Sequence, residues 1–181
     1  GSMAGAHDVD ESLSAAVLLE NLACKATGAL ALEHVLRISG LASEEVQYVI
    51  GSGEEAVGDR YQRGGGNLAK AIAEQAGCVN ASGSDVKAFC CGPVHALVAA
   101  GSLVAAGVFP HVVVVAGGSL AKLGMKFAGA LRHGVPVLED VLAGFAVVVG
   151  PPGGGAPEIR LDAVGRHRVG SGSAQQAVLE D

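Results

Sequence analysis

The chain has 181 residues, a net charge of −6 at pH 7 and a composition that is 50% hydrophobic but only 3% aromatic. This length predicts one domain with a substantial core. Because the excess charge is negative and no run of Lys or Arg is present, we do not expect nucleic acid or a membrane as a partner. No apolar run reaches the ~20 residues that a transmembrane helix needs.

Four cysteines, Cys24, Cys78, Cys90 and Cys91, form no C-x-x-C pair. Two adjacent cysteines cannot comfortably chelate one metal ion, so we expect no metal site. The sequence has no recognisable secretory signal, and the cysteines are therefore interpreted as reduced thiols of a cytoplasmic protein.

The N-terminal part of the chain contains two helix patterns and one strand pattern. Residues 1–11 are interpreted as a tag remnant with a loose lead. Apolar residues then recur through 15–40, with Ser12 or Ser14 before them and Gly40 as a stop, which predicts a long helix. The elements that follow are a strand over 44–52, a glycine-rich loop over 53–66 and a helix over 68–77 capped by Asn67.

The C-terminal part contains the remaining strands. The run of valines in 111–118 indicates a strand buried on both faces. The other elements are a strand over 82–89, a helix from Gly92 or Pro93 to Ala106, an irregular or partly helical stretch over 119–144, a strand over 145–150, an exposed strand over 159–169 and a loose tail over 171–181. Strands that alternate with helices predict a single α/β domain, residues 12–170, with a mostly parallel sheet.

The stretch DVKAFCCGPVHALVAAGSLVAAG, residues 85–107, places Cys90 and Cys91 where a strand gives way to a helix. The unpaired N–H groups and the dipole of a helix start favour negative charge, so a thiol at such a position has a lowered pKa and is more reactive. Gly92 leaves space beside the sulfur, and Pro93 suits a first helical turn. The alternative is that both cysteines are small, buried, apolar residues.

The helix that follows, VHALVAAGSLVAAG, is apolar on every face. One sheet covers only one face of a helix, so we expect a further element to cover the other. A lone histidine on an apolar face is usually a core residue, and His95 is interpreted in that way.

The order of these blocks resembles the thiolase-like superfamily. The segments EEVQYVIGS, SDVKAFCCGPVHALVAAGSLVAAG, HVVVVAGGSLA and EDVLAGFAVVVG follow one another as their counterparts do in β-ketoacyl-acyl carrier protein synthase III. Over residues 13–176 the chain most resembles the β subunits of component C of glycine/sarcosine/betaine reductase. The resemblance implies the N-terminal half of a thiolase fold, with three α/β/α layers and a mixed, mainly parallel sheet in the order 3-2-4-5-1.

In that superfamily an acyl-accepting cysteine lies at the start of a central buried helix. The resemblance places this role on Cys90, with Cys91 as the following small residue, and a shift of one residue would exchange them. Gly92 opens the helix whose N–H groups would stabilise an oxyanion. The catalytic His of the family belongs to its second half, and neither His95 nor His167 matches it. The first strand of the family has no counterpart in this chain.

A second candidate site is the stretch RYQRGGGN. Arg60 and Arg63 precede Gly65, Gly66 and Asn67 at the start of a predicted helix. Guanidinium groups, backbone N–H groups and the helix dipole together could hold a phosphate or a carboxylate. The alternatives are a turn whose arginines pair with nearby acidic residues and, as the resemblance implies, an interface with a second subunit.

The resemblance implies an acyl-transfer component that carries an acetyl group as a cysteine thioester and helps a phosphotransacetylase-like partner subunit to make acetyl phosphate. Its substrate would be acyl-CoA, an acyl-carrier thioester or acetyl phosphate, with no tightly bound cofactor. The alternatives are a fragment of a condensing enzyme and a non-catalytic assembly module. On each reading the chain needs a C-terminal half or a partner subunit, and we expect a homodimer through the strand Asp85–Phe89.

Overall fold

The structure, a computed structural model, describes residues 15–53, 67–88, 91–118, 131–134 and 142–165. The elements, in chain order, are α2 (Ala15–Ser39), the 3-10 turn η1 (Ser43–Glu45), β1 (Tyr48–Gly53), α3 (Leu68–Gln75), β2 (Ser82–Lys87), α4 (Gly92–Ala105), β3 (Val112–Ala116), β4 (Phe145–Val149) and the 3-10 turn η2 (Leu161–Ala163). All the α-helices and strands in this series were predicted from the sequence, with bounds that differ by a few residues. The two 3-10 turns were not predicted, and η1 occupies the start of the segment 44–52 that was expected to be a strand.

The four strands form one sheet in the order β2-β1-β3-β4. β1 pairs in parallel with both β2 and β3, whereas β4 runs antiparallel to β3. The order β2-β1-β3-β4 corresponds to strands 3-2-4-5 of the expected order 3-2-4-5-1. Strand 1 of that order would lie beside β4, and none of the described strands lies there. The predicted α/β class with a mixed, mainly parallel sheet is therefore confirmed.

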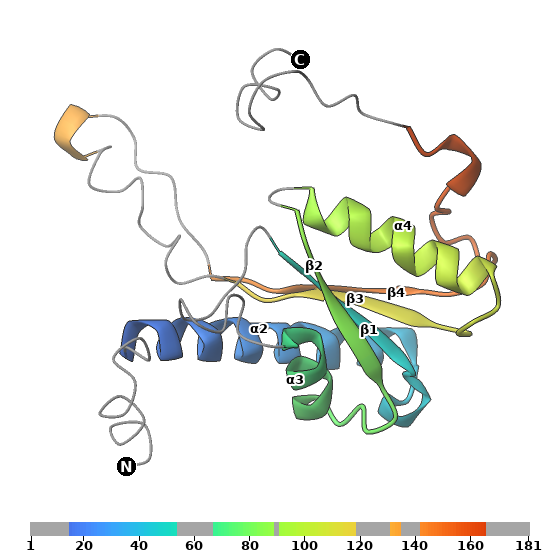
Figure 1. Cartoon of the computed structure of the whole chain (residues 1–181), viewed down its shortest axis with the longest axis horizontal. Coiled ribbons are helices and arrows are strands. Elements are labelled where there is room, and N and C mark those ends of the chain that lie inside the picture. The colour runs from blue at the N-terminus through green and yellow to red at the C-terminus, as the bar shows by residue number, and fades with distance from the viewer. Residues whose placement is uncertain (1–14, 54–66, 89–90, 119–130, 135–141, 166–181) are drawn as a thin grey trace.

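Helices cover both faces of the sheet (Figure 1), with α2 and α3 on one face and α4 on the other. The valines of β3 alternate between the two cores, since Val113 and Val115 pack with α2 and α3 while Val112 and Val114 pack with α4. All four are fully buried. The valine run thus belongs to a strand covered on both faces, as predicted.

α2 ends where its sequence indicates. Gly40 follows the last helical residue with φ of 71°, and its N–H donates to the carbonyl oxygen of Leu36 at 3.0 Å. A left-handed backbone at this position is strained for any residue with a Cβ atom, which is why glycine terminates the helix. The buried side of α2, with Leu32 and Leu36, packs on the sheet and on α3.

The prediction of an exposed strand over 159–169 is wrong for the part that the structure describes. Residues 159–165 contain η2 and no strand. Ile159 and Leu161 instead approach α4, where a Cβ atom on Gly101 would lie 3.3 Å from Leu161 Cδ2 and 3.6 Å from Ile159 Cγ2. These apolar side chains therefore cover the outer face of a helix rather than extending the sheet.

The expectation that α4 needs a second cover is only partly met by the chain itself. Ile159 and Leu161 reach its C-terminal half, but Val94 in its first turn is 62% exposed. His95 is also exposed, so its interpretation as a core residue is wrong. The residues of α4 that pack against the sheet are Ala96 and Ala100, and His95 is not among them.

Several other predictions concern parts of the chain outside the described residues. The lead over 1–11, the tail over 171–181 and most of the stretch over 119–144 belong there, apart from a short helical turn at 131–133. Among the residues that are described, no helix combines the length and the apolar character needed to cross a bilayer.

Candidate functional site

The start of α4 lies at the carboxyl ends of β1 and β2. Cys91 is the N-cap residue, and its N–H donates to the carbonyl oxygen of Ala88 at 3.0 Å while its own carbonyl accepts from His95 N at 3.1 Å. Pro93 lies in the first turn, as predicted. Cys91 is exposed, whereas Cys90 lies outside the described residues.

Gly92 lets this helix start approach the sheet closely. It is buried, and a Cβ atom added to it would lie 2.6 Å from the carbonyl oxygen of Gly53 and 3.2 Å from Gly53 N. Any side chain at residue 92 would therefore force α4 away from the end of β1. This close approach is a reason for the glycine that the sequence alone did not reveal.

The remaining cysteines are poor candidates for a nucleophile. Cys24 Sγ donates to the carbonyl oxygen of Gly118 at 2.9 Å, and burial, assisted by the negative charge of Glu20 and opposed by Lys87, raises its pKa to about 11. Burial also raises the pKa of Cys78. Both are packed thiols that stay protonated at neutral pH. Of the cysteines that the structure describes, only Cys91 is accessible.

The start of α3, the second candidate site, is closed by side chains of the chain itself. Asn67 Oδ1 accepts from Lys70 N at 2.9 Å, as expected of a capping residue, and Asn67 Nδ2 donates to the carbonyl oxygen of Gly83 at 2.7 Å. On β2, Asp85 Oδ2 accepts from Leu68 N at 2.7 Å and Asp85 Oδ1 from Ala69 N at 3.1 Å. These first-turn N–H groups are therefore already bonded.

Asp85 is the residue that sequence reasoning missed at this helix. Gly51 of β1 pairs with Asp85. A Cβ atom on Gly51 would clash with the Asp85 carboxylate, so a glycine at this position leaves the space through which the carboxylate reaches α3. The sequence signal that could have indicated this contact is an aspartate in one predicted strand together with a glycine in another predicted strand of the same sheet. Arg60, Arg63, Gly65 and Gly66 lie outside the described residues, and the anion-binding hypothesis stays a prediction that rests on them.

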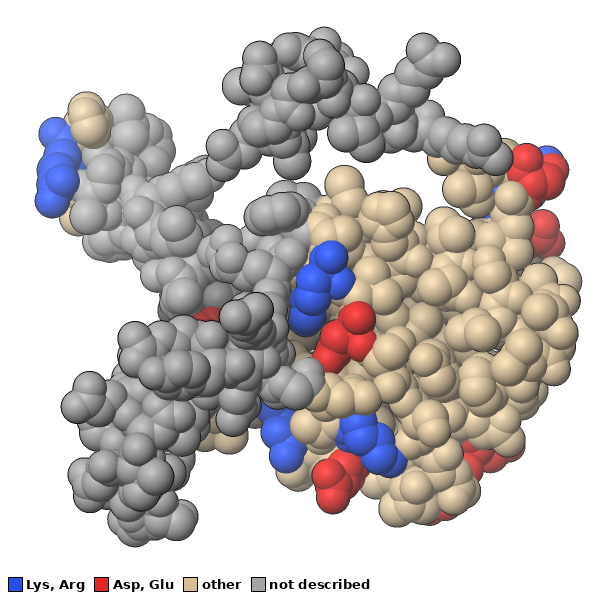
Figure 2. All heavy atoms as spheres, in the orientation of Figure 1, with Lys and Arg blue, Asp and Glu red and all other residues tan. Residues whose placement is uncertain are grey.

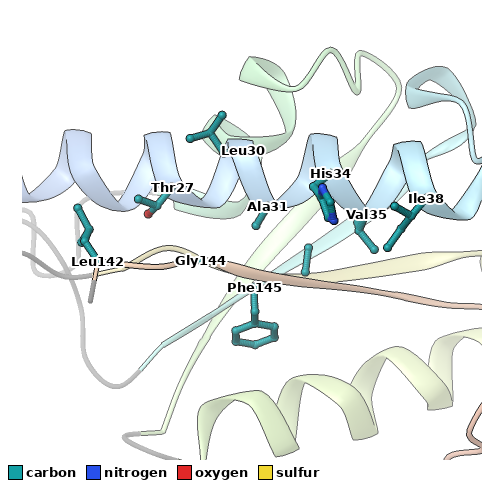
Figure 3. A pocket seen from close by; sticks show the side chains of 10 residues that line it. Thr27, Leu30, Ala31, His34, Val35, Ile38, Leu142, Gly144 and Phe145 are labelled. Atoms are coloured by element: carbon teal, nitrogen blue, oxygen red, sulfur yellow. The ribbon is translucent and has the colours of Figure 1, made fainter. Parts of the chain in front are cut away.

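An apolar groove of about 440 Å³ lies between α2 and the edge strand β4 (Figure 3). Its lining residues are Thr27, Leu30, Ala31, His34, Val35, Ile38, Leu142, Gly144, Phe145 and Ala146. The titratable member, His34, shares a hydrogen bond of 2.8 Å with Arg37 Nη2. The groove adjoins the sheet edge beside β4, where the order 3-2-4-5-1 places the first strand of the family, and it lies away from the start of α4. We interpret it as a gap in the sheet layer rather than as an active site.

No protein-family model matches the chain. Over 179 residues, or 99% of its length, the chain is 52% identical to a protein of Peptoclostridium acidaminophilum named glycine/sarcosine/betaine reductase complex component C subunit beta. The priming β-ketosynthase of the R1128 polyketide biosynthetic pathway is 30% identical and covers 71% of the chain with a TM-score of 0.57. The described part of the chain therefore has a thiolase-like α/β fold.

β-Ketoacyl-acyl carrier protein synthase III of Thermus thermophilus has the same fold, with 27% identity over 73% of this chain and a TM-score of 0.55. The chain spans 35% of the reductase subunit, and 35% and 38% of the two synthase chains. It therefore corresponds to about a third of the length of each relative. The resemblance predicted from the sequence blocks, to the synthases and to the reductase subunit, is confirmed.

Proposed function

We propose that the chain is an acyl-carrying component of a transfer reaction, in which Cys90 accepts the acyl group and Cys91 is the alternative acceptor. The observation that carries this proposal is the position of Cys91, which follows Cys90 in the sequence. Cys91 is the N-cap of α4 at the carboxyl end of a mainly parallel sheet, the edge at which α/β proteins bind their ligands. The other cysteines of the chain, Cys24 and Cys78, are buried thiols with raised pKa values.

The proposed step is a nucleophilic acyl substitution. The cysteine thiolate attacks the carbonyl carbon of the donor, a carbon–sulfur bond forms, and the carbonyl electron pair moves onto oxygen. The oxyanion then collapses and expels the leaving group, which is phosphate from acetyl phosphate or a thiolate from acyl-CoA or an acyl carrier. Helix N–H groups at Gly92 and beyond favour both the thiolate and the oxyanion. The step needs no tightly bound cofactor.

The acyl group that we propose is acetyl, and the setting is a cytoplasmic complex. The relative from Peptoclostridium acidaminophilum is named as a subunit of a reductase complex component, which supports a role beside other subunits. We propose that one of them is a phosphotransacetylase-like partner that releases acetyl phosphate. The surface of α4 supports the same view, because the helix has no charged residue and leaves Val94 62% exposed. In Figure 2 the described surface over α4 is likewise almost free of charged side chains.

We also propose a homodimer through β2 and the residues that follow it to Phe89. β2 is the edge strand of the sheet, so one of its sides has no described partner strand. Antiparallel pairing of two such edges would join two sheets into one and satisfy their free backbone groups. Hydrogen exchange of the β2 amides at two protein concentrations tests this: protection that rises with concentration supports the dimer, and equal exchange contradicts it.

The acyl-acceptor proposal is tested by the intact mass of the chain after incubation with acetyl phosphate or with acetyl-CoA. We expect one acetyl adduct in the wild type and in Cys91→Ser, and none in Cys90→Ser. Loss of the adduct only in Cys91→Ser would move the role to that residue. A folded wild type that gains no adduct, alone or with its partner subunits, would contradict acyl transfer and favour the assembly module.

A further inference from the structure

Ser52, near the end of β1, carries a buried hydroxyl that has no hydrogen-bond partner among the described residues. Its side chain is 4% exposed, and Oγ makes no hydrogen bond within the described part of the chain. It is the one polar residue among the buried side chains that the structure describes. Because an unsatisfied buried hydroxyl destabilises the folded state, such a group calls for a function in which it gains a partner.

The hydroxyl lies on the α4 face of the sheet. Ile50, two residues earlier in β1, packs against Ala96 and Ala100 of α4. Side chains two residues apart in a strand point to the same face, so Ser52 points to this side as well. Its register partner on β2, Val86, packs against the same cluster. The hydroxyl is therefore surrounded by apolar groups, in which a hydrogen bond to a charged acceptor is strong.

Ser52 also lies under the first turn of α4. The next residue, Gly53, meets Gly92 so closely that a Cβ atom on Gly92 would be 2.6 Å from its carbonyl oxygen. The 14-residue helix presents the positive end of its dipole at this point. A hydroxyl donor and a helix start thus converge on one small volume at the carboxyl end of β1, and both favour an anionic oxygen.

We propose that Ser52 binds the acyl group: its O–H donates a hydrogen bond to the carbonyl oxygen of the acyl donor at the start of α4. This inference rests on the acyl-transfer function proposed above. As the thiolate attacks and the carbonyl π electrons move onto oxygen, the acceptor becomes an anion and the hydrogen bond strengthens. The hydroxyl keeps its proton throughout, and the electron pair returns to the carbonyl when the leaving group departs.

The test compares Ser52→Ala, which removes the hydroxyl, with Ser52→Thr, which keeps it. The control is Ser102→Ala on α4, where the hydroxyl is exposed and donates to the carbonyl oxygen of Val98 at 2.8 Å. Two rates are measured, for the chain alone and in complex with its partner subunits. These are acetyl-adduct formation from acetyl phosphate, followed by mass, and alkylation of the acceptor thiol by iodoacetamide between pH 6 and pH 10. Circular dichroism verifies that each variant is folded.

We expect Ser52→Ala to slow acetylation about a hundredfold, the usual effect of losing one oxyanion donor, while the pH profile of alkylation stays as in the wild type. Ser52→Thr should restore most of the rate. Acetylation of Ser52→Ala at the rate of Ser102→Ala would overturn the inference and leave the acyl-transfer function intact. Equal slowing of alkylation would also overturn it, because the hydroxyl would then act on the thiol. A wild type that is alkylated but never acetylated would instead refute the proposed function itself.

Discussion

The Asp85→Ala substitution removes the carboxylate that closes the start of α3. In the folded chain this side chain reaches from β2 to the N–H groups of Leu68 and Ala69, at 2.7 and 3.1 Å. Without it, the two N–H groups have no described partner, while the bond from Lys70 N to Asn67 remains. The substitution should therefore weaken the attachment of α3 to the edge of the sheet without removing its own N-cap.

The expected loss of stability follows from two contributions. Removal of a capping side chain costs about 1 kcal/mol, and removal of a negative charge from a helix N-terminus costs about 0.3–1 kcal/mol. Because Asp85 is half-buried, the hydrogen bonds to its charged oxygens lie toward the upper end of their usual range. We therefore expect a decrease of about 2 kcal/mol in the free energy of unfolding. For a chain of this size that corresponds to a fall in Tm of about 4–8 °C.

Urea unfolding followed by far-ultraviolet circular dichroism measures this change. Asp85→Asn keeps one acceptor oxygen and should lie between Asp85→Ala and the wild type. Asp162→Ala removes a carboxylate whose partner, Arg160, is equally exposed at 68%, and it should leave the midpoint unchanged. If Asp85→Ala unfolded at the same urea concentration as Asp162→Ala, the conclusion that β2 holds the start of α3 would be refuted.

Three further predictions concern the cysteines and the start of α4. Gly92→Ala places a methyl group 2.6 Å from the Gly53 carbonyl oxygen and should lower the free energy of unfolding by about 1–3 kcal/mol in the same urea assay. Gly165 has open space around it, so the control Gly165→Ala should leave the free energy of unfolding unchanged. At pH 7.5 iodoacetamide should modify Cys91 well before the buried Cys24 and Cys78; peptide mapping that found Cys24 labelled first would contradict the assigned burial. Burial raises the pKa of Cys24 from 9.0 to about 11, so folding favours the thiol form over the thiolate. The contribution of this preference to the free energy of unfolding is complete below about pH 9 and is lost as the pH rises toward 11. Cys24→Ala should reduce the decline in stability over that window, and an unchanged decline would count against the raised pKa.

The elements that the sequence predicted well are those whose pattern is local. The period of apolar residues in α2 and the stop at Gly40 need no information from distant residues. The unbroken valines of β3 require cover on two faces, and this is enough to infer helices on both sides of a sheet. The last segment was misjudged because an apolar alternation around Ile159 fits a strand and the outer face of a helix equally well.

The candidate site divides in the same way. Cys91, Gly92 and Pro93 stand together in the sequence, and their position at a helix start follows from the strand before them and the helix after them. Ser52 and Asp85 carry no such local signal. Ser52 is only one of several small polar residues along the chain until β1 and α4 enclose it, and Asp85 is an ordinary polar strand residue until α3 is packed beside it.

The sequence by itself determined the α/β class, the order of the elements and the place of Cys91 at the start of α4, because propensity, periodicity and capping act over a few residues. Tertiary structure alone decided which polar groups are buried, which helix N–H groups are already bonded and which surfaces stay uncovered. The physical reason is that burial and hydrogen bonding depend on what packs against a residue in space. For Ser52 and Asp85 those neighbours come from segments between 16 and 48 residues away in the chain, such as Ala69 for Asp85 and Ala96 and Ala100 for the face that Ser52 occupies.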